Sequence, residues 1–125
     1  MLLNLYTGWI AFVVGVIAGA ISGLKFHTEE FLGGYTTWSR RLVRLAHISL
    51  FGLGLINILF ALTARSLGIV TGLTAASIAL LVGAVTMPLI CYLAAYKQPF
   101  RHLFFIPVLS VLYGVVVMTW RVIQQ

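Results

Sequence analysis

The chain has 125 residues, of which 62% are hydrophobic and only 8% are charged. Because soluble domains carry about 25% charged residues, this composition and a mean hydropathy of +1.10 exclude a soluble globular protein. The formal net charge of +6 would suit a nucleic-acid-binding protein, but the cations flank apolar segments instead of covering a polar face, so we expect no nucleic-acid partner.

Four apolar segments divide the chain: Leu2–Leu24, Leu42–Ala64, Ile69–Tyr96 and Leu103–Trp120. Each is close to or above the roughly 18 to 20 residues that a helix needs to cross about 30 Å of hydrocarbon. The sequence therefore predicts an all-α, integral membrane four-helix bundle that forms one domain, 1–125, with short loops. We place its helices at about 2–24, 39–64, 69–96 and 100–121.

The lysines and arginines are divided unequally between the two ends of the predicted bundle. Six flank the connections between the first and second helices and between the third and fourth: Lys25, Arg40, Arg41, Arg44, Lys97 and Arg101. Arg65 and Arg121 lie at the opposite end. Because positive residues accumulate in cytoplasmic loops, we expect the six in the cytoplasm and both termini outside, in an inner (plasma) membrane. We also expect the basic residues to bind anionic lipid headgroups, at about 1 kcal/mol each.

Small residues recur at helical spacing in two of the predicted helices. In the first helix Gly15, Gly19 and Gly23 are four residues apart, a pattern that lets a second helix approach closely. The third helix repeats the pattern with Gly72, Ala76, Ala79 and Gly83. Both patterns predict tight helix–helix contacts.

The longest connection, from Lys25 to Thr37, contains His27, Glu29 and Glu30. These side chains are of metal-ligand type, but charge balance with neighbouring arginines is the interpretation we favour for the two glutamates. They are the only acids in the chain. A transporter that couples protons through a membrane-embedded carboxylate is therefore excluded.

The second predicted helix carries the most informative residues. His47 lies about one turn inside the membrane, below Arg40 and Arg44 on the same helix face, and Gly54 two turns further leaves a flat space beside the helix. Asn57 is the other polar group at depth. We expect it to form an interhelical hydrogen bond that contributes about 0.6 kcal/mol.

Two histidines predicted near the same side of the membrane suggest a haem. His47 and His102 could ligate the iron of a b-type haem, with Gly54 or Gly114 leaving room for the ring. Arg40, Arg44 and Arg101 would then bind the propionates.

A quinone headgroup is the related alternative for this site. His47 would then donate a hydrogen bond to it, with Tyr92 or Arg44 alongside. The structural alternative is a neutral His47 bonded to a backbone carbonyl or to a hydroxyl, such as that of Ser110 or Tyr92, on a neighbouring helix.

The absence of aspartate, and of any acid beside a serine–histidine pair, argues against hydrolysis, phosphoryl transfer and nucleophilic catalysis. We therefore expect no enzyme activity from this chain alone. The sequence predicts a small membrane subunit of an electron-transfer, respiratory-type complex that binds haem b or quinone near its cytoplasmic face, alongside other membrane subunits. The alternatives are a cofactor-free accessory subunit that packs against larger membrane subunits and a small channel or transporter.

Overall fold

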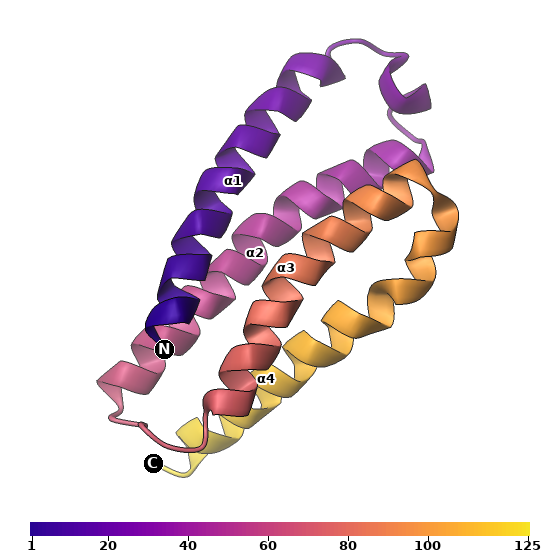
Figure 1. Ribbon diagram of the computed structural model, residues 1–125. Helices are drawn as coiled ribbons and strands as arrows, with labels where there is room; N and C mark the ends of the chain where they lie inside the picture. The colour runs from indigo at the N-terminus through magenta and orange to yellow at the C-terminus, as the bar shows by residue number, and fades with distance from the viewer.

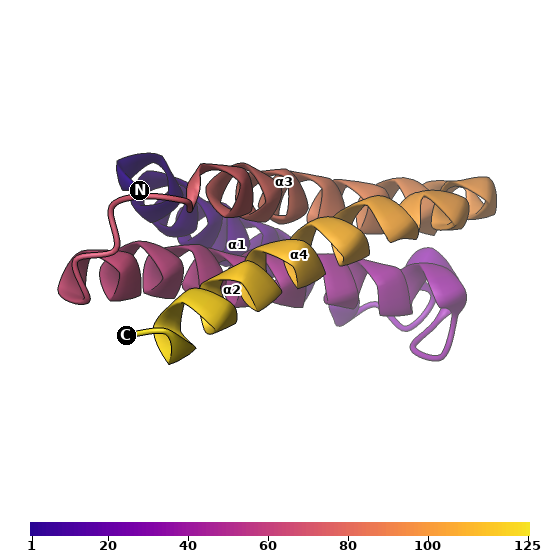
Figure 2. The same ribbon diagram turned by 90° about the horizontal axis from the view of Figure 1, so that it is seen from below.

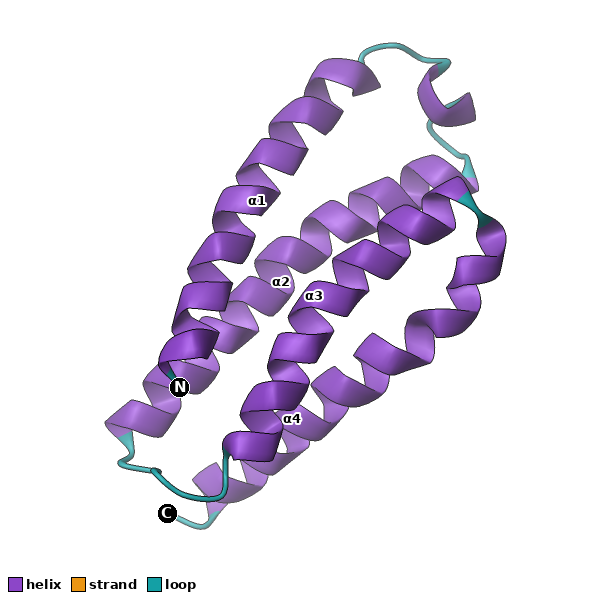
Figure 3. Ribbon diagram, in the orientation of Figure 1, coloured by secondary structure: helices purple, strands orange, loops and turns teal.

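A computed structural model describes the whole chain, residues 1–125, as helices and connecting loops (Figure 3). The elements are α1 (Leu2–Phe26), η1 (Phe31–Gly33), α2 (Trp38–Ser66), α3 (Thr74–Tyr96), η2 (Gln98–Phe104) and α4 (Phe105–Ile123). α1, α2, α3 and the continuous η2–α4 segment are each long and apolar enough to cross a membrane. The protein is an all-α, multi-pass membrane protein, as the composition predicts.

The helices are not equally buried. α2 and α3 form the centre, and α1 and α4 lie on opposite faces of this pair (Figures 1 and 2). In the most apolar stretch of each span, the buried share of the residues is 50% in α2 and 39% in α3. It is 17% in α1 and in the η2–α4 segment. α1 packs mainly against α2, and α4 packs mainly against α3.

The antiparallel packing gathers the charges as predicted from the sequence. Both chain termini lie at one end of the bundle, and the α1–α2 loop and the α3–η2 turn lie at the other (Figure 1). We call the latter the basic end, because it carries Lys25, Arg40, Arg41, Arg44, Lys97 and Arg101. Arg65 and Arg121 lie at the far end, where α2 and α4 finish.

A buried polar network joins α1, α2 and α3. Asn4 and Asn57 are both fully buried, and the Asn4 amide Nδ2 donates to Asn57 Oδ1 at 2.9 Å and to the Ser77 carbonyl at 3.2 Å. The Ser77 hydroxyl donates to Asn4 Oδ1. Asn57 Nδ2 in turn donates to the carbonyls of Leu53, at 2.9 Å, and Leu80, at 3.3 Å. The interhelical bond predicted for Asn57 is confirmed, and Asn4 is the partner that sequence reasoning missed.

Glycines allow α1 to approach α2 closely. A Cβ at Gly8 would lie 2.6 Å from the Gly54 carbonyl oxygen, one at Gly15 would lie 2.8 Å from the Phe51 ring, and one at Gly19 would lie 2.5 Å from His47 Nε2. Gly23 meets nothing within 4 Å. The predicted seam is therefore confirmed at Gly15 and Gly19, begins earlier at Gly8, and does not extend to Gly23.

The contact between α3 and α4 also depends on glycine. A Cβ at Gly83 would overlap the Val111 side chain, and one at Gly114 would lie 2.5 Å from Leu80. Ala76 is fully buried, and its carbonyl oxygen would lie 3.1 Å from the Gly114 Cβ. At these two positions the helices approach closely because one of them has no side chain.

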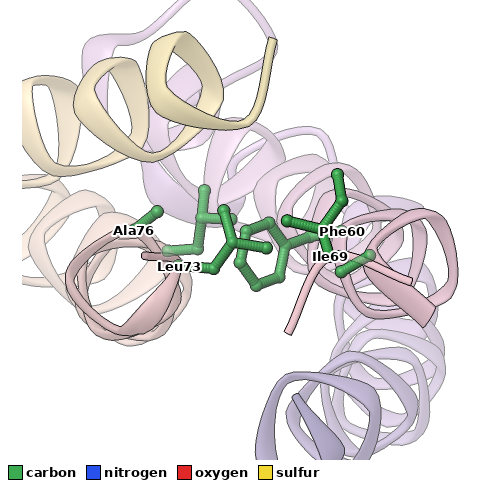
Figure 4. Packing of buried hydrophobic residues seen from close by; sticks show 6 residues of the cluster. Phe60, Ile69, Leu73 and Ala76 are labelled. Atoms are coloured by element: carbon green, nitrogen blue, oxygen red, sulfur yellow. The ribbon is translucent and has the colours of Figure 1, made fainter. Parts of the chain in front are cut away.

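The third helix begins at Thr74, so the predicted start at residue 69 is wrong. Gly68 and Gly72 have φ of 66° and 74°, a left-handed conformation that breaks the helix. Ile69 and Leu73 are nevertheless buried, and they pack with Phe60 and Ala76 in the core between α2 and α3 (Figure 4). Hydropathy alone cannot separate such a buried apolar loop from a helix.

The fourth span also differs from the prediction of one α-helix over 100–121. Its first part, η2, is a 3-10 helix, and the α-helix starts at Phe105. Pro107 has no N–H to donate to the carbonyl of Leu103, and it lies in the first turn of α4, where this loss costs no helical hydrogen bond. The proline therefore favours a helix that starts at Phe105, although Pro88 in α3 shows that an α-helix of this bundle also accommodates an internal proline.

Gly8→Ala should lower the free energy of unfolding by about 1 to 3 kcal/mol, since the new Cβ would meet backbone at Gly54 and the side chain of Ile58. Gly23→Ala adds the same atom at an open position, where alanine favours the helix by up to about 1 kcal/mol, so that variant should be neutral or stabilised. Unfolding in mixed micelles, followed by ellipticity, measures both. Equal effects of the two substitutions would contradict the observed seam.

Asn4→Leu and Asn57→Leu should each destabilise the bundle, and the double variant should lose less than the sum of the two. Each single substitution leaves the partner amide buried without its bond, so we expect a coupling free energy of about 0.6 to 1.7 kcal/mol. The same unfolding measurement on the unaltered protein, the two single variants and the double variant gives this coupling free energy. Thr86→Val is the control, because the Thr86 hydroxyl donates only to the Val82 carbonyl of its own helix. Strict additivity would show that the network is not a unit.

Candidate functional site at the basic end

His47 lies inside the membrane span of α2, close to the basic end. The residues between Arg44 and Arg65 cover about 30 Å of helix, which matches the thickness of the hydrocarbon core. His47 is three positions below Arg44, or about 4.5 Å further into the membrane. By this spacing the imidazole lies just within the apolar region.

The surroundings of His47 are apolar. Its ring and that of Phe51 form a T-shaped pair, with centroids 5.3 Å apart and an interplanar angle of 83°. Nε2 faces the backbone of α1 at Gly19. None of the side-chain hydrogen bonds within the chain involves His47, so the predicted bond to Ser110 or Tyr92 is not formed.

Aromatic rings continue from His47 along the α1–α2 interface. Phe51 lies 5.7 Å from Phe12, and Phe12 lies 5.6 Å from Trp9, measured between ring centroids. A Cβ at Gly54 would lie 3.0 Å from the Phe12 ring and from the Gly8 carbonyl oxygen. The flat space expected beside Gly54 is thus filled by α1.

His102 lies elsewhere. It is exposed on η2, and η2 packs against α3, whereas His47 faces α1. The structure therefore does not bring the two imidazoles together as a pair. The space at Gly114, the other position considered for a flat ring, is occupied by Leu80.

Arg40 is committed to the protein's own loop. Only 4% of the residue is exposed, and its guanidinium donates to the carbonyl of Phe26, at the end of α1, and to the backbone carbonyl of Glu29 at 3.3 Å. It also lies over the Phe26 ring, 4.6 Å from the centroid. A cation at the last carbonyls of a helix complements the helix dipole, so Arg40 caps α1 and fixes the loop.

The other two predicted anion-binding arginines differ from each other. Arg44 lies over the Tyr35 ring, 4.3 Å from the centroid, and donates to the Tyr35 carbonyl at 3.4 Å. Arg101 is exposed on η2. Of Arg40, Arg44 and Arg101, only Arg101 is not engaged by the α1–α2 loop.

The loop itself does not form a metal centre. His27, Glu29 and Glu30 are all exposed. No group of three His, Cys, Asp or Glu side chains in the chain is close enough to hold a metal ion.

An apolar groove, not foreseen from the sequence, runs between α2 and α4 with α3 as its floor. Its volume is about 530 Å³, and its walls include Leu45, Gly52 and Ile56 of α2 and Pro107 and Val115 of α4. The groove exists because α4 packs on α3 and leaves this face of α2 open. Gly52 could have indicated this groove from the sequence, because it is a small residue that belongs to neither predicted seam.

Comparisons of this chain with known protein families, with curated proteins and with solved structures find no match.

Arg40→Met should loosen the α1–α2 loop, because it removes charged hydrogen bonds that contribute about 1.5 to 3 kcal/mol each. We expect a glutamate-specific protease to cut at the exposed Glu29 or Glu30 at least about tenfold faster than in the unaltered protein, since cleavage follows the population of the open loop. Arg41→Met, at an exposed neighbour, is the matched control and should leave the rate unchanged. Identical cleavage of both variants would refute the capping role of Arg40.

Proposed function

We propose that this protein is a small integral-membrane subunit of an electron-transfer complex of the respiratory type, and that His47 binds a quinone headgroup near the basic end. The observation that carries the proposal is an imidazole about one turn inside the membrane with no hydrogen-bond partner in its own chain. Ionisable side chains within membrane spans mark ion, proton or cofactor sites. A neutral imidazole N–H can donate to a quinone carbonyl oxygen.

The contacts of the two histidines favour quinone over haem b. A haem with two axial histidines needs both imidazoles on facing helices, but His102 is exposed on η2. Nε2 is covered by α1 at Gly19, so a haem iron there would require α1 to move away, whereas a quinone would accept its hydrogen bond from Nδ1. Haem b, with its second ligand supplied by a partner subunit, is therefore the second form of the proposal.

The charge distribution supports an orientation for this site. Six cations at the basic end, against two at the far end, favour a cytoplasmic position for the basic end in an inner (plasma) membrane. The headgroup would then be reached from the cytoplasmic leaflet. Because the chain has no catalytic set of its own, the redox chemistry belongs to the assembled complex, and other membrane subunits supply the electron donor or acceptor.

One observation favours a cofactor-free accessory subunit as the second candidate. Most polar side chains inside the bundle are used in folding: Asn4 bonds to both Asn57 and Ser77, and Arg40 caps α1. A protein of this kind would act by packing against larger membrane subunits. It would bind no redox ligand at His47.

The purified protein should bind decylubiquinone, measured by quenching of tryptophan fluorescence in detergent, and His47→Phe should weaken binding about tenfold. Phenylalanine keeps the ring packed against Gly19 and Phe51 but has no N–H, whereas His47→Gln retains a donor and should lose less. His102→Phe is the matched control and should bind normally.

A visible spectrum of the same preparation separates the remaining possibilities. A reduced-minus-oxidised band of b-type haem that is lost in His47→Phe and kept in His102→Phe would replace quinone by a haem that takes one ligand from this chain. A folded, colourless protein that binds no quinone would support the accessory subunit.

A further inference from the structure

The apolar groove between α2 and α4 has the length of a lipid chain in one leaflet. Its α2 wall runs from Leu45 to Ile56, about 17 Å at 1.5 Å per residue, and half of the hydrocarbon core is about 15 Å. It starts directly below Arg41, which is one helical turn before Leu45 on the same face of α2. The groove therefore leads from the basic end to about the middle of the membrane.

The chemistry of the groove suits a hydrocarbon chain. Ser49 is the polar side chain in its lining, and its hydroxyl donates to the carbonyl of Ala46 at 2.7 Å. Gly52 leaves open space, since a Cβ there would meet nothing within 4 Å. No polar group in the lining is left to select a polar ligand.

The end of the groove is positively charged. Arg41 is exposed above the α2 wall, and Arg101 is exposed on η2, which leads into the α4 wall at Pro107. Arg40 and Arg44 are held by the α1–α2 loop, so Arg41 and Arg101 are the arginines at this end that the loop does not engage.

We propose that the α2–α4 groove is a binding site for one anionic phospholipid, with an acyl chain along Leu45 to Ile56 and the phosphate between Arg41 and Arg101. This combination, an apolar slot as long as one leaflet below two cations, matches a molecule with a long hydrocarbon chain and an anionic head. A second copy of the chain fits less well. It would bring its own Arg41 and Arg101 to the same place, while both acids of the chain lie in the α1–α2 loop.

The test uses the purified full chain in detergent, with native mass spectrometry after addition of palmitoyl-oleoyl phosphatidylglycerol or the matching phosphatidylcholine. We expect one phosphatidylglycerol to be retained with at least tenfold higher affinity than phosphatidylcholine. Arg41→Gln and Arg101→Gln should each weaken phosphatidylglycerol binding about fivefold, the factor that corresponds to about 1 kcal/mol per cation. Lys25→Gln, on α1 at the opposite face of the α2–α3 pair, is the charge control and should have no effect.

Gly52→Leu should reduce binding of both lipids, because leucine would occupy the groove. Gly23→Leu adds the same side chain at another open helical glycine and should bind as the unaltered protein does. Circular dichroism checks that the glycine variants are folded, and the arginine variants test the site independently of them.

Four results would overturn the proposal. These are equal affinity for the two lipids, arginine variants that behave like Lys25→Gln, a folded Gly52→Leu variant that behaves like Gly23→Leu, and a dimer mass that Gly52→Leu abolishes. The last result would assign the groove to a second copy of the chain. The proposal does not depend on a ligand at His47, since that residue faces α1 and not the groove.

Discussion

The hydrogen bonds among Asn4, Asn57 and Ser77 determine how three of the four helices fit together. An amide in hydrocarbon has no water to bond with, so both asparagines must find partners inside the protein. Each finds them on a neighbouring helix, and each is fully buried. A slip of one helix by a single residue would separate these groups. The network therefore fixes the helix register more than its modest free energy suggests.

The glycine contacts depend on that register. Gly8 lies against Gly54 and Ile58, and Gly19 lies against His47, only when α1 is aligned as the asparagines require. Dispersion between closely packed backbones then adds to the polar bonds, which matters in lipid because no hydrophobic effect drives helices together.

Polar side chains at the helix ends complete the arrangement. Ser39 donates to the carbonyl of Ala95 at the end of α3, and Trp38 donates to that of Ala94. At the far end, Arg121 donates to the carbonyl of Thr71 at 2.9 Å. With Arg40 at the end of α1, the contacts of Ser39 and Trp38 satisfy carbonyls that a helix leaves open, and the contact of Arg121 holds the α2–α3 loop. The polar groups that remain for binding other molecules are the few that folding does not use, notably His47, Arg41 and Arg101.

The sequence predicted the spans and their order because hydropathy and helix length are local properties. It failed for residues 69–73, which are as apolar as a helix but contain Gly72 in a left-handed conformation. Asn4 could have been found, since asparagine inside an apolar helix is itself a signal; its partner could not, because that depends on which helices become neighbours. Likewise, the place of His47 on α2, one turn beyond Arg44, was predictable from the sequence. Its separation from His102 was not, because it results from α4 packing on α3.

Because the chain returns to the end at which it started, its two termini lie close to the same membrane surface. A tandem duplication joined through a short linker would insert both copies in the same orientation, giving a parallel repeat and not the inverted repeat found in many transporters. Fusion to either terminus would also leave the orientation of an attached membrane segment unchanged. The even number of crossings thus makes this bundle a unit that can be added to a larger polypeptide without inverting the membrane spans on either side of it.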